Sequence, residues 1–220
     1  MNVSPNQSLL VPKIDVSAVN AIDVSVIMQK YCITYRSIEK VNWNDYPYCP
    51  QTQFAIAYTP DSVLLHFKVK EADVRGFVVQ DLGPVSSDSC VEFFACMGDD
   101  DVYYNIECNC LGYISMGARK TRNEKEHASS EILQQIKRWT TFGSNPIGEI
   151  RRQTEWECAI VIPFTAFFKH SIQDISGQNI RANFYKCGGS NEYKHYVSWN
   201  PIKSEKPDFH RPECFGLISF

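Results

Sequence analysis

The chain has 220 residues, a formal net charge of −3 and 44% hydrophobic residues, with 13 Phe, 11 Tyr and 4 Trp. This is enough apolar material for a substantial core, and the length suits one large all-β domain or two small domains. Lys and Arg are scattered along the sequence, which argues against a nucleic-acid partner or an anionic membrane surface. No stretch is apolar for long enough to predict a transmembrane helix.

The nine cysteines predict reduced thiols. Their number is odd, the chain is large enough to fold without cross-links, and most of them lie in apolar, strand-like runs. No C-x-x-C pair occurs, so a zinc site has weak support. The first residues, 1–5, lack a basic region followed by an apolar core, so no signal peptide is predicted. Both features favour a cytoplasmic location, or export if a signal has been removed.

In chain order, Val16–Met28 is predicted as a short helix or a loop, and Tyr31–Tyr35 has the composition of a strand. Gln53–Thr59 and Val63–Lys70 flank a turn and predict an antiparallel hairpin. Further strands are predicted at Asp88–Cys96, Val102–Cys110, Glu155–Ile162, Arg181–Cys187, around Trp199 and at Cys214–Phe220. Arg119–Lys137 is expected to be a long exposed loop with a short helix, and Pro163–Phe168 to form one helical turn.

Short strands separated by turns, without crossover helices between them, are typical of an antiparallel sandwich. The sequence therefore predicts an all-β fold, an antiparallel β-sandwich of the immunoglobulin or jelly-roll kind with little helix. No internal repeat or linker is evident, so residues 1–220 are predicted to form a single domain.

Two of the predicted strands carry a face that is both polar and aromatic. The period of two puts these residues on one face of each strand: Arg181, Asn183 and Tyr185 in the later strand, and Tyr103, Asn105, Glu107 and Asn109 in the earlier one. Planar donors and acceptors of this kind suit a ligand rich in hydroxyl groups. The alternative is a solvated sheet face without a ligand.

The motif Asp88-Ser89-Cys90-Val91-Glu92 resembles the Asp-Ser-x-Glu central strand of carbohydrate-binding module family 9-like proteins. Further motifs follow in the same order: Tyr103–Asn109, Arg181–Cys187, Trp199 with Pro207–Gly216, and Phe220. The resemblance implies a DOMON-like β-sandwich that binds sugars and often accompanies glycoside hydrolases in carbohydrate catabolism. It also implies a terminal sugar held between two tryptophans, and bound calcium.

On this resemblance, Trp199 is expected to stack on a sugar ring, and Trp43 is the better candidate for the second tryptophan; the alternative for Trp199 is a core position. Trp139 and Trp156 are expected in the core. The residues expected to hydrogen-bond the sugar hydroxyls are Arg181, Asn183, Tyr185, Asn105 and Glu107, with Tyr103 and His210 at the rim.

Three alternatives remain open at this point. Glu92 and Glu107 could serve as the two carboxylates of a small glycan-acting hydrolase if they face each other across a cleft. Asp99–Asp101 could hold a structural Ca²⁺, although the spacing is not that of an EF-hand, and the metal ligands are not identified. A haem domain would need axial ligands, and no Met/His pair is obvious.

Overall fold

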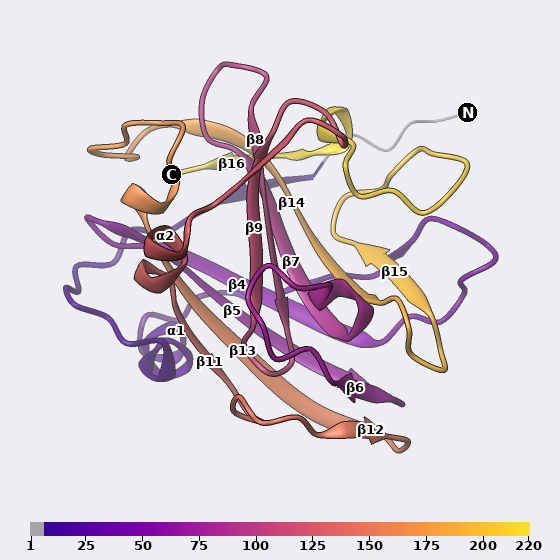
Figure 1. The fold of residues 1–220 in the computed structure, drawn as a ribbon. Helices are drawn as coiled ribbons and strands as arrows, with labels where there is room; N and C mark the ends of the chain where they lie inside the picture. The colour runs from indigo at the N-terminus through magenta and orange to yellow at the C-terminus, as the bar shows by residue number, and fades with distance from the viewer. Residues whose placement is uncertain (1–6) are drawn as a thin grey trace.

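The computed structural model describes residues 7–220, in which two antiparallel sheets pack face to face (Figure 1). The larger sheet has nine strands, ordered β1 (Ser8–Leu10), β16 (Gly216–Ser219), β14 (Asn179–Gly188), β7 (Ser89–Cys96), β8 (Tyr103–Asn109), β9 (Ile114–Arg119) and β10 (Lys125–His127), with β15 (His195–Ser198) and β3 (Lys40–Val41) joined to β14. Within it, β1 pairs with β16 in parallel. The prediction of an all-β sandwich is confirmed.

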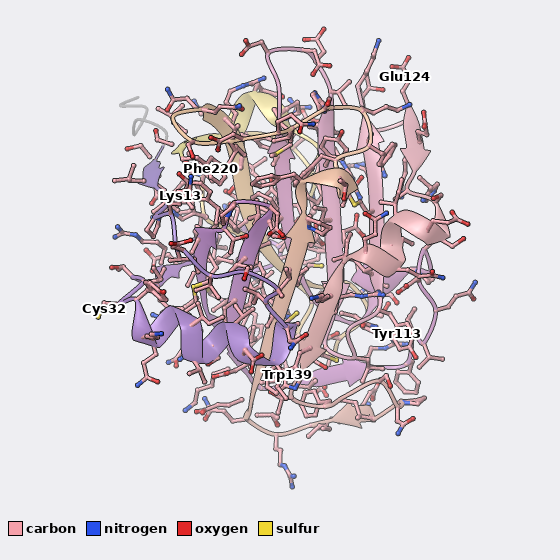
Figure 2. All side chains as sticks on the ribbon, turned by 90° about the vertical axis from the view of Figure 1, so that its left-hand side faces the viewer. Lys13, Cys32, Tyr113, Glu124, Trp139 and Phe220 are labelled. Atoms are coloured by element: carbon pink, nitrogen blue, oxygen red, sulfur yellow. The ribbon has the colours of Figure 1, made fainter. Side chains whose placement is uncertain are left out.

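The second sheet has five strands, ordered β11 (Lys137–Thr140), β13 (Thr154–Pro163), β5 (Ser62–Glu71), β4 (Gln51–Tyr58) and β2 (Arg36–Ser37). A small two-stranded sheet joins β6 (Val74–Gly76) to β12 (Gly148–Ile150). The outer face of the five-stranded sheet is covered in part by α1 (Val24–Lys30), which packs near the half-buried Trp139 (Figure 2). No helix among residues 7–220 has the length and apolar character needed to span a membrane.

The main core lies between the sheets because the strands alternate apolar residues toward each other. Phe184 of β14 stacks on Phe54 of β4 with ring centroids 3.6 Å apart, and it also stacks on Phe93 of β7. Tyr104, on the face of β8 opposite to Tyr103, lies in the same cluster. One shared core agrees with a single domain over residues 1–220. This stays a prediction, because residues 1–6 lie outside the described residues. The signal-peptide prediction rests on residues 1–5, so it also lies outside them.

Two segments differ from the sequence-based expectations. Tyr31–Tyr35 is not a strand, because α1 ends there in a turn in which Cys32 has a φ of +53°. Arg119–Lys137 contains the predicted short helix, α2 (Ser130–Gln135), but it also contains β10, which was not predicted. The side chain of Ser129 caps α2 by accepting a hydrogen bond from the Ile132 amide.

A buried ion pair connects the two sheets. Lys186 Nζ of β14 lies 2.8 Å from Glu71 Oε2 at the end of β5, and both side chains are fully buried. Trp156 Nε1 donates to the other oxygen of Glu71 at 2.7 Å. Burial, followed by the charge of Lys186, holds the pKa of His195 well below its usual range, so its neutral ring can accept a hydrogen bond from Lys186 at 2.8 Å. Each buried charge therefore has a partner.

All nine cysteines lie within the described range and are unpaired, in agreement with the prediction of reduced thiols. Six of them are buried. Burial in strands is the setting in which a thiol behaves as a small apolar side chain.

Candidate ligand-binding site

A pocket of about 320 Å³ opens on the outer face of the nine-stranded sheet. Its floor consists of Glu92 and Phe94 of β7, Glu107 of β8 and Cys187 of β14. Its walls come from loops that are distant in sequence: residues 84–87, residues 189–190 and residues 207–210, together with Arg122 and Tyr196. The volume lies at the small end of the range for ligand pockets.

Strand register explains why these side chains meet. Glu92 pairs with Tyr185 of β14 on one side and with Glu107 of β8 on the other. In the next row, Phe94 lies between Asn183 and Asn105. Directly opposed residues of antiparallel strands point to the same face of the sheet, so both rows face the pocket side.

Glu107 and His210 are the two predicted site residues that line the pocket. Tyr103 and Asn105 lie behind them and are fully buried. Asn105 Nδ2 donates to Glu107 Oε1 at 2.8 Å, and Asn105 Oδ1 accepts from Arg119 at 2.7 Å. Tyr103 Oη lies 3.1 Å from His210 Nδ1. Asn105 and Tyr103 therefore orient the two pocket-lining residues.

The three predicted residues of β14 hold the segment that forms one wall. Tyr185 is buried, stacks on Phe209 at 4.2 Å and donates its hydroxyl proton to the Phe209 carbonyl. Asn183 Oδ1 accepts from the Asn200 amide at 2.9 Å. Arg181 is exposed and donates to the Pro212 carbonyl. None of the three lines the pocket, so their predicted direct contact with a ligand finds no geometric support.

Trp199 lies in the core, and the expectation that it faces solvent is wrong. Only 2% of its surface is exposed, and its ring meets Phe54 and Phe184 edge-on, at 5.7 and 5.8 Å. Its amide donates to the Phe184 carbonyl, so it continues the pairing of β15 with β14. Alternation along β15 then points His195, Val197 and Trp199 inward. Trp199 is too deeply buried to stack on a sugar ring.

The second expected tryptophan, Trp43, is also buried, with 6% of its surface exposed. Its indole N–H donates to the Ser204 carbonyl, and its ring packs against Phe209. Phe94, Tyr196 and Phe209 are the aromatic residues that line the pocket, and only Tyr196 among them is half-exposed. Tyr196 was not predicted, although it alternates with Val197 and so belongs to the outer face.

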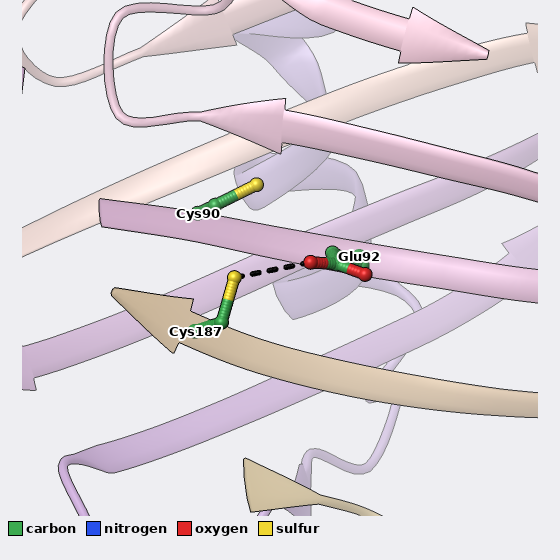
Figure 3. A group of neighbouring side chains, drawn as sticks. All are labelled: Cys90, Glu92 and Cys187. Carbon is green, nitrogen blue, oxygen red and sulfur yellow. Dashed lines mark hydrogen bonds between the residues drawn. The ribbon is translucent and has the colours of Figure 1, made fainter. Parts of the chain in front are cut away.

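The carboxyl groups of the floor are in an unusual environment. Burial raises the pKa of Glu92 well above its usual range, and the neighbouring Cys187 and Glu107 raise it further. Cys187 Sγ donates to Glu92 Oε1 at 3.0 Å (Figure 3). Burial also raises the pKa of Glu107, against the opposing influence of Lys125, Asn105 and Arg119. Glu92 therefore retains its proton and can both donate and accept hydrogen bonds.

Three basic side chains influence the His210 side of the pocket. Burial, followed by the charges of Arg119, Arg122 and Lys125, lowers the pKa of His210 to about 3, so its ring is neutral. Arg122 lies 3.1 Å from Asp208 and connects the β9–β10 turn to the 207–210 wall. The ion pair therefore joins two loops that both line the pocket.

The Asp-Ser motif serves mainly to hold the segment that follows β6. Asp88 is fully buried and pairs with Arg75. It also accepts hydrogen bonds from the amides of Phe77 and Val78 and from Asn109. Of this motif, Glu92 is the residue that lines the pocket.

A larger groove of about 720 Å³ lies on the outer face of the five-stranded sheet. Its floor contains lysines and glutamates that pair with each other, such as Lys70 and Glu155 at 2.7 Å. The only aromatic residue that lines it is Trp156, which is 1% exposed and presents no ring face. The smaller pocket is therefore the better candidate for a ring-shaped polar ligand.

Within residues 7–220, a single group of three His, Cys, Asp or Glu side chains brings its ligand atoms within 4.8 Å of one another: Cys90, Glu92 and Cys187. Asp99–Asp101 do not converge in this way. Asp100 instead accepts from the Val102 amide and lies 3.3 Å from His170. Among the described residues, the pocket lining includes His210 but no methionine, so these residues offer no Met/His pair for haem.

The chain is similar to carbohydrate-binding proteins in both sequence and structure. The sequence profile described as carbohydrate-binding family 9 matches residues 22–220. The crystal structure of a "putative carbohydrate-binding protein" from Bacteroides uniformis ATCC 8492 is similar to the chain, with 41% identity, a TM-score of 0.95 and coverage of 98% of this chain and 99% of that one. No curated protein matches the chain.

Two more distant structures share the fold. Both are family 9 carbohydrate-binding modules from Caldicellulosiruptor kristjanssonii. One is in complex with glucose, with 10% identity, a TM-score of 0.60 and coverage of 97% of this chain and 95% of that one. The other is in complex with cellotriose, with 11% identity, a TM-score of 0.61 and coverage of 97% and 93%.

Proposed function

Because the chain belongs to carbohydrate-binding family 9, we propose that the pocket over Glu92 and Glu107 binds one sugar residue of a glycan. The observation that carries this proposal is the combination of two carboxyl groups and a neutral histidine with a half-exposed aromatic ring in one small pocket. Sugar hydroxyls need paired donors and acceptors, whereas the C–H face of a sugar ring packs on an aromatic ring.

Each group has a role in this proposal. Glu92 and Glu107 hydrogen-bond adjacent hydroxyls from the floor, and His210 approaches from the wall. Tyr196 covers one face of the sugar ring. We expect modest affinity, because every sugar hydroxyl gives up water before it gains a protein partner.

The test begins with a glycan array on the purified chain, followed by calorimetric titration. Glucose and cellotriose are the first probes, since the two C. kristjanssonii modules are in complex with them. Glu107→Gln keeps the acceptor for Asn105 but alters the hydroxyl contacts, and we expect it to weaken binding by about tenfold or more.

The matched control is Glu155→Gln, an exposed glutamate on the opposite sheet. We expect its affinity to stay within about twofold of the wild type. A folded protein that binds no glycan on the array would contradict the proposal. Equal affinity in Glu107→Gln and wild type would place the site elsewhere.

The hydrolase alternative is not favoured. Glu92 and Glu107 are cross-strand partners on one face of the sheet, so both would contact a ligand in the pocket from the same side. Glycoside hydrolysis instead requires carboxyl groups that flank the scissile bond. We propose that any role in polysaccharide breakdown is indirect and that the chain increases the local concentration of a glycoside hydrolase at its substrate. Co-purification of such an enzyme with the chain would test this role.

A further inference from the structure

Cys90, Cys187 and Glu92 form a buried cluster at the floor of the pocket. Cys90 and Cys187 are direct cross-strand partners on β7 and β14, and Glu92 follows two residues after Cys90. All three side chains therefore point to the pocket face of the sheet (Figure 3). Their ligand atoms lie within 4.8 Å of one another.

We infer that Cys90, Cys187 and Glu92 form a binding site for a thiophilic divalent cation such as Zn²⁺. Two cysteine sulfurs and one carboxylate oxygen are a donor set that zinc accepts in proteins. Two sulfurs on one tetrahedral zinc lie roughly 3.8 Å apart, since each Zn–S bond is about 2.3 Å. Ligand atoms that all lie within 4.8 Å of one another are compatible with this spacing.

The cluster is accessible to an ion and has room for a fourth ligand. Cys187 and Glu92 line the pocket, so an ion can reach them from solvent. Three protein ligands leave one position of a tetrahedral ion open for water or another ligand. Binding replaces the thiol protons and the proton on Glu92, so we expect proton release on metal uptake. The two positive charges of the cation then offset two of the three negative charges on its ligands, which leaves a net charge of −1 in the buried site.

This inference goes beyond the proposed function and does not depend on it, because metal binding is measured without sugar. Glu92 belongs to both sites, so the two ligands should affect each other. If zinc changes the affinity for glucose by some factor, glucose must change the affinity for zinc by the same factor.

The experiment titrates Co²⁺ into the full chain, freed of metal by a chelator and kept reduced by a reductant that does not bind metals. We expect one equivalent to bind, with sulfur-to-cobalt charge-transfer bands and the visible bands of a tetrahedral ion, and Zn²⁺ to displace it. Cys90→Ser and Cys187→Ser should each weaken binding by at least about a hundredfold. Cys96→Ser is the matched control, because Cys96 is buried on the same face of β7 outside the cluster.

Wild-type protein that develops no thiolate band would overturn the inference, whatever the variants do. A band that survives in both cluster variants would assign the metal to other cysteines and also overturn it. If circular dichroism shows that either serine variant does not fold, Glu92→Gln is tested instead. This variant retains both thiols and should bind Co²⁺ more weakly than the wild type. If the wild-type protein binds no glycan, the proposed function is contradicted, and the metal-binding result still stands.

Discussion

Glu92 of β7 and Glu107 of β8 are direct cross-strand partners, and both side chains line the same pocket. Two negative charges in this position would destabilise the sheet. The pKa of each group is raised, with burial as the first cause, and that of Glu92 is raised the more strongly. The pair therefore presents a protonated carboxyl group beside a second carboxyl, a combination that can donate and accept hydrogen bonds without two buried charges.

Because its pKa is raised, Glu92 should make the folded state less stable as the pH rises. A carboxyl whose pKa is higher in the folded state stabilises the fold at low pH, and this contribution is lost as pH rises above the unfolded value of about 4.3. Glu92→Gln retains the shape of the side chain and removes the titration. In chelator-treated protein we expect its melting temperature to exceed that of the wild type at pH 8, with a smaller difference at pH 5. Equal differences at both values would contradict the assignment.

Tyr196 is expected to provide the stacking surface. Tyr196→Ala should lose about 1–3 kcal/mol of binding free energy, or roughly tenfold to a hundredfold in affinity. Tyr196→Phe retains the ring and should bind within about threefold of the wild type. The measurement is calorimetric titration with the best array ligand. If the alanine variant binds as well as the phenylalanine variant, another surface contacts the sugar ring.

Trp199 should contribute to stability and not to binding. Trp199→Ala creates a cavity between Phe54 and Phe184, and we expect it to cost about 3–5 kcal/mol of unfolding free energy in urea. Trp199→Phe fills part of that space, so it should fold with reduced stability and bind glycan normally. A Trp199→Phe protein with an unchanged melting temperature but no glycan binding would restore the direct role that the sequence predicted.

His210 should reduce stability in acid. Its pKa is about 3 in the folded protein, against about 6.5 in an unfolded chain, so the unfolded state binds the additional proton between these values. Stability is therefore lost as pH falls from 6.5 toward 3. His210→Gln should show a shallower fall in melting temperature over pH 6.5 to 4. Superimposable slopes for the two proteins would mean that His210 does not contribute.

The buried ion pair should be more sensitive to mutation than any surface pair. Lys186→Met leaves Glu71 buried without its counter-charge, and we expect a cost of about 3–5 kcal/mol. Lys70→Met is the matched control, because Lys70 pairs with the exposed Glu155 at a similar distance, and it should cost less than about 1 kcal/mol. Urea denaturation measures both variants. Similar costs for the two would show that Lys186 is effectively solvated.

Local alternation was sufficient to predict the two faces of β8 and β14, because successive side chains of a strand point to opposite faces. The pairing that brings Glu92 against Glu107 is long-range, and no local pattern specifies it. The prediction for Trp199 rested on the family resemblance, and it was wrong because the Trp199 amide still pairs with β14 and its ring is buried in the core. Alternation along β15 could have identified Tyr196 as an outward-facing residue, because its neighbours His195 and Val197 are both buried.

β9 was not predicted, although Ile114, Met116 and Ala118 alternate with Ser115, Gly117 and Arg119, because the run is short and its Gly and Ala have low strand propensity. Arg122 and Asp208 come from two loops that only the folded structure brings together. The 207–210 wall depends on Tyr185, whose hydroxyl bonds to the Phe209 carbonyl. These contacts join residues far apart in sequence, so composition and spacing carry no signal for them.

The pairing of Lys186 with Glu71 has a consequence for how β14 aligns during folding. A slip of β14 by one residue would turn Lys186 toward the outer face and Tyr185 toward the core, and it would leave Glu71 buried without a partner. Such misaligned states are therefore penalised by an unpaired charge. The same alignment sets Tyr185 beside Glu92 on the opposite face. A lysine that never touches the pocket thus helps to select the one strand alignment in which the pocket exists.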